Sequence, residues 1–388
     1  MKICILTPRF PMPENGGDVL RINNIARYLK KQGHSLVLVS YYETGNEISA
    51  ASRIYDKIYY VKRHRFQSLF FSLIYFICGK PIQCGFYFSP SFEKLLKRVI
   101  EIESPDMYIS HLLRMTTYLE HCGLQNKSIV EMTDALSKTY SLSQQASSVN
   151  IKKVIYSVER SRINKYERRV INTFPKVVLV SRADLNYFRS IGVSDSSLCV
   201  YSNGVDCPKN FNESYEVNKI CFVGNMRTLQ NQDAAIYFVN EIFPKILKKR
   251  PDTRFYIVGA EPNACVRELT RRNNNVIVTG YVDNIQDVIY DSCVLVAPVR
   301  IAAGIQNKVL VAMASGIPVV MTSLISKAIP ELENGINCMI SDEASSFADC
   351  CLRLMWNKDL RNSLARQGYE IVKMRYSWEG RLAGYEEM

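Results

Sequence analysis

The chain has 388 residues, of which 47% are hydrophobic and 22% charged. It is therefore globular rather than disordered, and too long for one ordinary hydrophobic core, so two domains are expected. Its net charge is +12, and the whole excess lies in residues 1–200, which hold 28 Lys and Arg against 16 Asp and Glu. This asymmetry predicts a surface that meets an anionic partner: nucleic acid, a phosphorylated substrate or the cytoplasmic membrane leaflet.

The start of the chain, "MKICILTPRFP", is expected to be a buried strand and not a signal peptide. No apolar run reaches the roughly 18 residues needed to span a bilayer. The twelve cysteines form no CxxC pair and do not cluster with histidine. We therefore expect reduced thiols in a cytosolic protein, with no metal site.

The first 40 residues alternate strand, loop, helix and strand. Residues 2–6 are a buried apolar run, 7–18 are rich in Pro and Gly, 18–33 have apolar residues at helical spacing, and 34–40 are again apolar. This order predicts the opening of a doubly wound parallel sheet. Further strands are expected at 57–62, 107–111, 127–134, 176–180 and 198–206, and a long basic helix at 150–173.

The same architecture begins again near residue 206, without any repeat of sequence. Strands are expected at 216–223, 254–261, 276–282, 294–300 and 317–322, with helices between them, and the tail is helical with a break at Gly368. The sequence thus predicts an α/β protein with two doubly wound domains, at 1–205 and 206–365, and a C-terminal helix at 366–388 that packs back on the first domain.

Three segments have features that suit a phosphate group. Gly16 and Gly17 precede a helix, where backbone N–H groups can approach an anion, although a tight turn explains them equally well. Gly224 ends a strand and Arg227 follows it, either to pair with a diphosphate or as an exposed loop residue. The third segment, "RIAAGIQNKVLVAMASG" at 300–316, follows a strand end, where open α/β sheets bind ligands. It offers the following groups: Arg300, Gly304, the helix start at Ile305, Gln306 and Asn307, and Lys308.

Over nearly its whole length the chain resembles the family 4 glycosyltransferases. The resemblance is carried by "FVGNMRTLQNQDAAIYFVNEIFPKI", by "VIVTGYVDNIQDVIYDSCVLVAPVRIAAGIQNKVLVAMASGIPVVMTS" and by "YSNGVD". These enzymes have the GT-B fold, two Rossmann-like domains that face each other across a cleft. The segment "AGIQNKVLVAMA" is most similar to the corresponding segment of sugar transferases from bacterial capsule, exopolysaccharide and lipopolysaccharide clusters.

The resemblance implies a hexosyltransferase-type enzyme (EC 2.4) that uses a nucleotide-diphosphate sugar, retains anomeric configuration and needs no obligatory metal or cofactor. It places Gly17 at the donor's distal phosphate, Arg227 and Lys308 at the diphosphate, and the backbone of Tyr281 and Val282 at the nucleobase. His111, at a strand end, matches a histidine near the reacting sugar, although a buried core histidine is the competing interpretation. Asp134 ends another strand and is expected to face the same cleft as a second catalytic candidate, although aspartates at strand ends often cap the next helix.

The chain departs from the family in one respect. The family's two glutamates, spaced E-x7-E, would fall on Ala303 and Val311, and both carboxylates are missing. Losing ribose contacts would weaken donor binding by roughly 1–3 kcal/mol. A catalytically impaired partner protein therefore stays open as an alternative to a transferase, and so does a nucleotide-sugar epimerase, which also uses the GT-B fold.

Residues 62–78, "KRHRFQSLFFSLIYFIC", place a basic cluster before an apolar run that is too short to span a bilayer. This is either a buried helix or an interfacial element on anionic lipid. With the one-sided charge, it predicts a protein on the inner face of the cytoplasmic membrane and a glycan or polyprenyl-linked acceptor. Nucleic-acid binding is not expected, because no recognised module is present.

Overall fold

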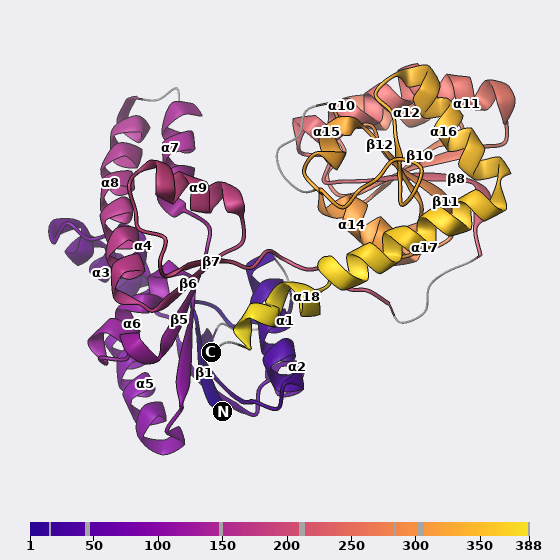
Figure 1. The fold of residues 1–388 in the computed structure, drawn as a ribbon. Coiled ribbons are helices and arrows are strands. Elements are labelled where there is room, and N and C mark those ends of the chain that lie inside the picture. The colour runs from indigo at the N-terminus through magenta and orange to yellow at the C-terminus, as the bar shows by residue number, and fades with distance from the viewer. Residues whose placement is uncertain are drawn as a thin grey trace. The chain divides into compact units, whose positions relative to one another are not determined.

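The structure, a computed structural model, describes residues 1–14, 17–42, 47–146, 150–208, 214–282, 284–300 and 306–386. The chain forms two compact units (Figure 1). The first consists of Met1–Asn203 together with Arg381–Met388, and the second of Gly204–Gly380. Each unit is a parallel β-sheet with helices, which confirms the predicted fold class.

The first unit has a seven-stranded sheet in the order β3-β2-β1-β4-β5-β6-β7, and every pair of neighbours is parallel. The strands are β1 (Lys2–Thr7), β2 (Ser35–Tyr42), β3 (Lys57–Lys62), β4 (Met107–His111), β5 (Ser128–Thr133), β6 (Lys176–Leu179) and β7 (Leu198–Val200). The helices are α1 (Gly17–Lys31), α2 (Ile48–Ala51), α3 (Arg65–Ile77), α4 (Ile82–Phe86), α5 (Pro90–Glu103), α6 (Thr116–His121), α7 (Leu136–Ala146), α8 (Asn150–Thr173) and α9 (Arg182–Ser190).

The second unit has a six-stranded parallel sheet in the order β10-β9-β8-β11-β12-β13. The strands are β8 (Glu216–Val223), β9 (Arg254–Val258), β10 (Val276–Gly280), β11 (Ser292–Ala297), β12 (Val319–Met321) and β13 (Met339–Ile340). The helices are α10 (Leu229–Tyr237), α11 (Phe243–Lys249), α12 (Ala264–Arg272), α13 (Ile285–Ile289), α14 (Asn307–Ala314), α15 (Ser323–Ser326), α16 (Ala344–Trp356), α17 (Lys358–Arg375) and α18 (Trp378–Leu382), and a π-turn at Phe238–Ile242 joins α10 to α11.

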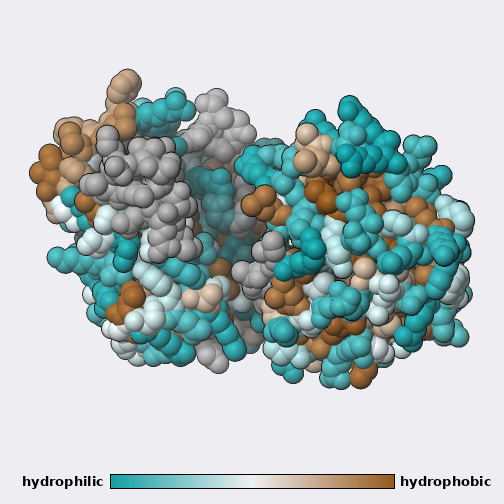
Figure 2. Space-filling view, turned by 90° about the horizontal axis from the view of Figure 1, so that it is seen from above, coloured by the Kyte–Doolittle hydropathy of each residue, from teal (hydrophilic) through white to brown (hydrophobic). Residues whose placement is uncertain are grey.

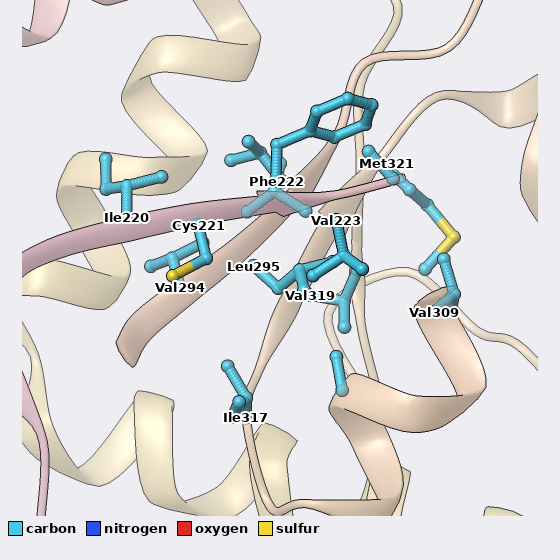
Figure 3. Packing of buried hydrophobic residues seen from close by; sticks show 14 of the residues in the cluster. Ile220, Cys221, Phe222, Val223, Val294, Leu295, Val309, Ile317, Val319 and Met321 are labelled. Atoms are coloured by element: carbon cyan, nitrogen blue, oxygen red, sulfur yellow. The ribbon is translucent and has the colours of Figure 1, made fainter. Parts of the chain in front are cut away.

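Strands in the middle of each sheet are buried on both faces, so their sequences are continuous apolar runs rather than alternating patterns. In the second unit β11 is buried along its whole length, and Phe222 of β8 and Val319 of β12 pack in the same cluster (Figure 3). Such runs explain why the strands were recognisable in the sequence.

The strand order reverses direction once in each sheet, between β1 and β4 in the first unit and between β8 and β11 in the second. On either side of such a point the crossover connections leave for opposite faces of the sheet, which opens a crevice outside the carboxyl ends of the strands. Each unit therefore has one position where a ligand site is expected on topology alone.

A buried ion pair joins α1 to β5 behind the crevice of the first unit. Arg21 donates from Nε to Glu131 Oε2 at 2.7 Å and from Nη2 to Oε1 at 3.2 Å, and both side chains are at most 1% exposed. Its remaining nitrogen, Nη1, donates to Asn203 Oδ1 at 3.0 Å. Arg21 thus fixes α1, β5 and Asn203, where the chain leaves the first unit, to one another.

We predict that Arg21→Met lowers the free energy of unfolding of the first unit by about 3–5 kcal/mol, because it leaves Glu131 buried and unpaired. Urea unfolding followed by circular dichroism measures this loss. Arg27 lies on the same helix as Arg21, and Arg27→Met, which breaks a partly exposed pair with Glu14, should cost less than about 1 kcal/mol. Equal losses in the two variants would contradict the prediction.

Candidate functional site

The crevice of the first unit holds a cavity of about 340 Å³. It lies at the N-terminus of α1 and beyond the carboxyl ends of β4 and β5. Its walls include the following residues: Gly17, Asp18, Arg21, Arg114, Thr133 and Asp134. The structure therefore brings two of the predicted site residues, Gly17 and Asp134, to one cavity.

Two residues that line this cavity have strained backbones. Leu112, after β4, has φ +70°, and Thr133, at the end of β5, has φ +72°. Left-handed backbone is uncommon outside glycine and especially unfavourable for a β-branched residue such as threonine. Strain of this kind costs on the order of 1–3 kcal/mol per residue and is concentrated at ligand sites. The backbone at these two strand ends is therefore better explained by a ligand site than by stability.

His111, the last residue of β4, is 2% exposed, and neither ring nitrogen has a hydrogen-bond partner among the described residues. Burial lowers its pKa to about 3, and Arg21, Arg114 and Arg9 add to this lowering, while Asp18 opposes it. The imidazole is therefore neutral near pH 7. A buried polar ring that lacks partners is costly unless a ligand supplies them.

Asp134 is exposed beyond the end of β5, and its pKa is raised, first by partial desolvation and then by the nearby Asp184. It does not cap α7 by any described hydrogen bond. The N–H of Ser137 in the first turn of that helix instead donates to Glu167 Oε1 at 3.2 Å. The carboxylate of Asp134 is therefore available to the cavity.

In the second unit, Lys308 and Gly224 meet around Asn231. Lys308, in the first turn of α14, is 9% exposed, donates from Nζ to Asn231 Oδ1, and lies 4.6 Å from the ring centroid of Phe222. Among the described residues Lys308 has no carboxylate partner. Burial lowers its pKa to about 8, since desolvation disfavours the ammonium form.

The turn after β8 passes close to the neighbouring strand, and glycine is required at this approach. A Cβ on Gly259, whose φ is +151°, would lie 1.9 Å from the carbonyl oxygen of Gly224. A Cβ on Gly224 would lie 2.6 Å from the side chain of Asn231. The glycines thus allow Asn231 to reach Lys308 at the carboxyl end of the sheet.

The two predicted arginines of this unit already have carboxylate partners. Arg227 donates from Nε and Nη2 to Glu261 at 2.6 Å in each case, and Arg300 donates to Asp233 at 3.1 and 2.6 Å. Arg300 also lies over the ring of Tyr237. A diphosphate would have to displace these partners or share the guanidinium groups with them.

The other predicted donor residues surround the same sheet edge. Tyr281 follows β10, is 74% exposed, and lines a cleft of about 480 Å³ with Glu261 and Arg267. Val282 packs against the core. Gln306 precedes α14 and Asn307 begins it, and among the described residues no side chain caps the N-terminus of this helix.

Gly16, Gly304 and Ile305 lie outside the described residues, as does Ala303. Val311 lies in α14 and packs partly buried against the core of the second unit. The position where the family has its second glutamate is therefore apolar in its surroundings as well as in its side chain.

Several site residues were not found from the sequence. Asn231 was missed because an asparagine in "TLQNQD" has no distinguishing pattern, and only the fold brings it to Lys308. Arg21, Arg114 and Thr133 were missed for the same reason. A buried arginine in an amphipathic helix, such as Arg21, is the one signal that could have drawn attention.

Comparisons with known proteins agree with this architecture. Residues 217–357 match the family described as "Glycosyl transferases group 1". The chain has the GT-B fold, and the family match lies within its second unit. The resemblance inferred from the sequence is confirmed to this extent, and the glycosyltransferase class is supported.

A curated relative is a Klebsiella pneumoniae protein, named "Uncharacterized 44.6 kDa protein in cps region", which is 24% identical over 97% of this chain and 96% of its own. Among solved structures, Anabaena Alr3699/HepE in complex with UDP has a TM-score of 0.63 and 13% identity, over 100% of this chain and 99% of its own. A glycosyltransferase from Rickettsia africae has a TM-score of 0.62 and 17% identity, over 100% and 97%. At these identities the solved structures establish the fold.

Within the described ranges no helix is both long and apolar enough to cross a membrane. The same ranges contain no group of three or more His, Cys, Asp or Glu side chains that could hold a metal ion. That the enzyme needs no obligatory metal or cofactor stays a prediction from the resemblance.

We predict that His111 does not titrate between pH 5 and pH 8. Its pKa is lowered from 6.5 to about 3, so the folded state stays neutral at this position and loses stability only as the pH falls below 6.5. Histidine NMR spectra recorded across this range, with the His111→Asn variant to identify the signal, measure this directly. A midpoint for His111 between pH 5 and pH 8 would show that the ring is hydrated or ion-paired.

Proposed function

We propose that this protein transfers a sugar from a nucleotide-diphosphate sugar to a glycan acceptor in the synthesis of a bacterial surface polysaccharide, with retention of anomeric configuration. The observation that carries the proposal is Lys308. A buried ammonium group without a carboxylate partner, at the carboxyl edge of a parallel sheet, is the charge that a diphosphate would neutralise.

The environment of Lys308 suits a diphosphate in particular. The first turn of α14 is the positive end of the helix, and among the described residues no side chain caps it, so its backbone N–H groups can donate to an anion. Asn231 holds the lysine side chain in place. In this site, charge that develops on a departing diphosphate would meet groups that are already oriented, which is the most effective form of electrostatic catalysis.

The proposed reaction needs no protein base. The bond between the anomeric carbon and the diphosphate oxygen breaks, the acceptor hydroxyl oxygen bonds to the same face of that carbon, and the hydroxyl proton passes to the departing phosphate. In the first unit, the neutral His111 would hydrogen-bond the sugar or acceptor, and Asp134 would bind acceptor hydroxyls. Both assignments are proposals that follow from the resemblance and from the cavity.

Alr3699/HepE has been crystallised with UDP, with UDP and glucose, and with UDP-glucose. These complexes support a nucleotide sugar as the donor of this chain. In the second unit, the cleft beside Tyr281 offers an exposed ring, and a nucleobase would stack there. We therefore propose a uridine nucleotide as the first donor to test.

We further propose that the acceptor is met at an anionic membrane surface. In α3, four large side chains are more than 60% exposed, namely Phe66, Leu69, Phe70 and Ile77, and the exposed Leu73 continues the same surface. The buried residues of this helix are Ser68, Ser72 and Tyr75. Brown side chains gather over this part of the molecule in Figure 2. The helix thus presents its apolar residues outward, so the interpretation as a buried helix is wrong.

This outward orientation is built into the packing of α3. A Cβ on Gly85 of α4 would lie 2.5 Å from the carbonyl oxygen of Phe71, so the two helices approach closely only at a glycine. Small serines of α3 are buried at its inner face, and the bulky residues are left outside. Arg162 of α8 lies over the ring of Phe76, which adds positive charge to the edge of the apolar surface.

We predict that Lys308→Met weakens UDP binding at least tenfold, because it removes a charge-assisted hydrogen bond to the diphosphate. Calorimetric titration with UDP measures this, and Lys245→Met, at an exposed lysine of α11, is the matched control. In the wild type, affinity should fall as the pH rises through about 8, where Lys308 loses its proton, and this fall should vanish in Lys308→Met.

Unchanged UDP affinity in Lys308→Met would contradict the assignment of the diphosphate site. Incubation of the wild type with a UDP-sugar separates the other functions. Conversion of the sugar nucleotide without any acceptor would indicate an epimerase, and tight binding with no turnover on any acceptor would indicate a non-catalytic partner protein.

For the membrane surface, we predict that replacing Phe66, Leu69 and Phe70 together by serine abolishes co-sedimentation with vesicles that contain phosphatidylglycerol. Burying these three side chains in the interface supplies several kcal/mol, and the exposed side chains contribute little to folding. Leu229→Ser, at an exposed leucine of the second unit, should have no effect. Binding of the wild type that is independent of anionic lipid would contradict the proposal.

A further inference from the structure

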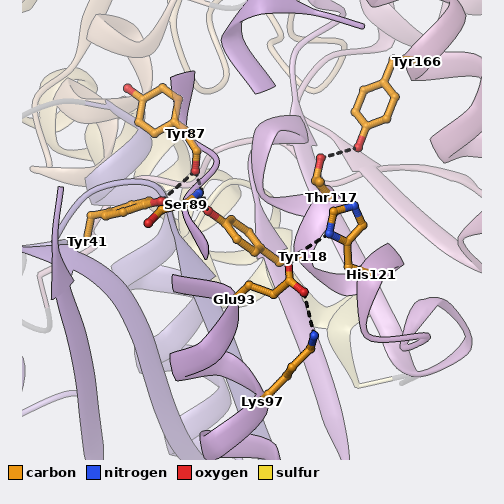
Figure 4. A network of polar contacts seen from close by, with 9 residues as sticks. All are labelled: Tyr41, Tyr87, Ser89, Glu93, Lys97, Thr117, Tyr118, His121 and Tyr166. Carbon is orange, nitrogen blue, oxygen red and sulfur yellow. Dashed lines mark hydrogen bonds and ion pairs between the residues drawn. The ribbon is translucent and has the colours of Figure 1, made fainter. Parts of the chain in front are cut away.

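A tyrosine with a rigidly held backbone lies between α3 and the cavity of the first unit. The carbonyl oxygen of Tyr87 accepts hydrogen bonds from the hydroxyls of Tyr41, at 2.9 Å, and Tyr118, at 2.7 Å (Figure 4). Both of these tyrosines are at most 1% exposed. The Tyr118 hydroxyl also accepts the N–H of Ser89 at 2.8 Å. The chain at Tyr87 is therefore fixed by one strand, β2, and one helix, α6.

Two guanidinium groups share the ring of Tyr87. Arg114 has its Cζ 4.8 Å from the ring centroid, and Arg63 has its Cζ 5.2 Å from the same centroid. The two like charges are thus no farther apart than the sum of these distances. We call Arg63, Tyr87 and Arg114 the arginine platform. Cation–π contact stabilises each charge but does not neutralise it.

The segment that supplies Arg63 and Tyr87 has no carboxylate of its own. Residues 57–92 contain five Lys and Arg and not one Asp or Glu. Among the described residues Arg114 has no ion pair, and its Nε is buried without a hydrogen-bond partner. An arginine with a buried, unpaired donor is expected to meet an anion when the protein is in use.

The arginine platform also has a defined position relative to the proposed chemistry. Arg114 lines the same cavity as Gly17 and Asp134. Arg63 lies two residues before the start of α3, the helix whose apolar side chains face outward. A molecule that reached from the apolar surface of α3 to the cavity would pass the platform between its apolar part and its reacting part.

We propose that the arginine platform binds the phosphate or diphosphate of a lipid-linked acceptor, with the lipid chain toward α3 and the glycan in the cavity. This inference rests on the proposed function and specifies its acceptor as an anionic one. Arginine suits the task, because its planar group can donate two parallel hydrogen bonds to a phosphate. The phosphate of a membrane lipid has the same chemistry, and the experiment must separate the two sources.

The test measures binding of soluble probes to the full chain by calorimetry. Geranyl diphosphate has both an isoprenoid chain and a diphosphate, geraniol has the chain alone, and inorganic pyrophosphate has the charge alone. The variants are Arg114→Gln and Arg63→Gln. Arg98→Gln, at an exposed arginine of α5, makes the same change of net charge outside the platform and is the matched control.

We expect Arg114→Gln to bind geranyl diphosphate at least tenfold more weakly than the wild type, the loss typical of a charge-assisted hydrogen bond. Arg63→Gln should also bind geranyl diphosphate more weakly than the wild type, while the affinity of Arg98→Gln stays within twofold of the wild-type value. Geraniol should bind all variants alike, which also shows that the first unit is folded. Pyrophosphate should bind weakly and show the same ranking of variants.

Undiminished binding of geranyl diphosphate by both platform variants would overturn the inference, as would an equal loss in Arg98→Gln. Vesicles of phosphatidylglycerol form the second arm. If Arg114→Gln weakens vesicle binding as much as it weakens geranyl diphosphate binding, the platform binds lipid headgroups and the acceptor assignment is wrong. UDP titration of the same variants is the separate readout of the proposed function, because Lys308 lies in the other unit.

Discussion

In both sheets all strands run parallel, so the chain must cross a face of the sheet after each strand before it can enter the next. The crossings change direction once in each unit, at β1 and β4 and at β8 and β11. This one constraint gathers the carboxyl ends of the central strands and the N-termini of the following helices at a single edge. His111 and Gly17 in the first unit, and Gly224 and Lys308 in the second, owe their positions to it.

Within that frame, the distribution of carboxylates decides which cations are available to a ligand. Arg227 and Arg300 are conspicuous in the sequence, yet both have ion-pair partners. Lys308 and Arg114 have none among the described residues. Buried charge without a counter-ion is unfavourable in the protein alone, so its presence is better explained by an anionic ligand than by stability. The strained backbones of Leu112 and Thr133 indicate the same trade of stability for function.

The first unit combines three kinds of surface that a lipid-linked anionic substrate would use. The outward apolar side chains of α3 suit a bilayer interface, the arginine platform suits a phosphate, and the cavity beyond β4 and β5 suits a polar glycan. Because α3 buries two serines and exposes three of its four phenylalanines, this helix departs from the usual rule of apolar residues inside. The excess of basic residues among the first 200 thus corresponds to a surface that suits an anionic substrate.

The sequence by itself determined the two doubly wound sheets, because central parallel strands are buried on both faces and must be apolar throughout, and glycines mark where strands turn into helices. It also located Gly17, His111, Gly224 and Lys308, since each of them stands at such a boundary. It did not identify Asn231 or Arg114, show that Arg227 is paired with Glu261, or decide which way the apolar residues of α3 face. Only the tertiary structure decided these, because a side chain's partners come from segments far away in the chain, and periodicity along one helix specifies which residues share a face but not whether that face is buried.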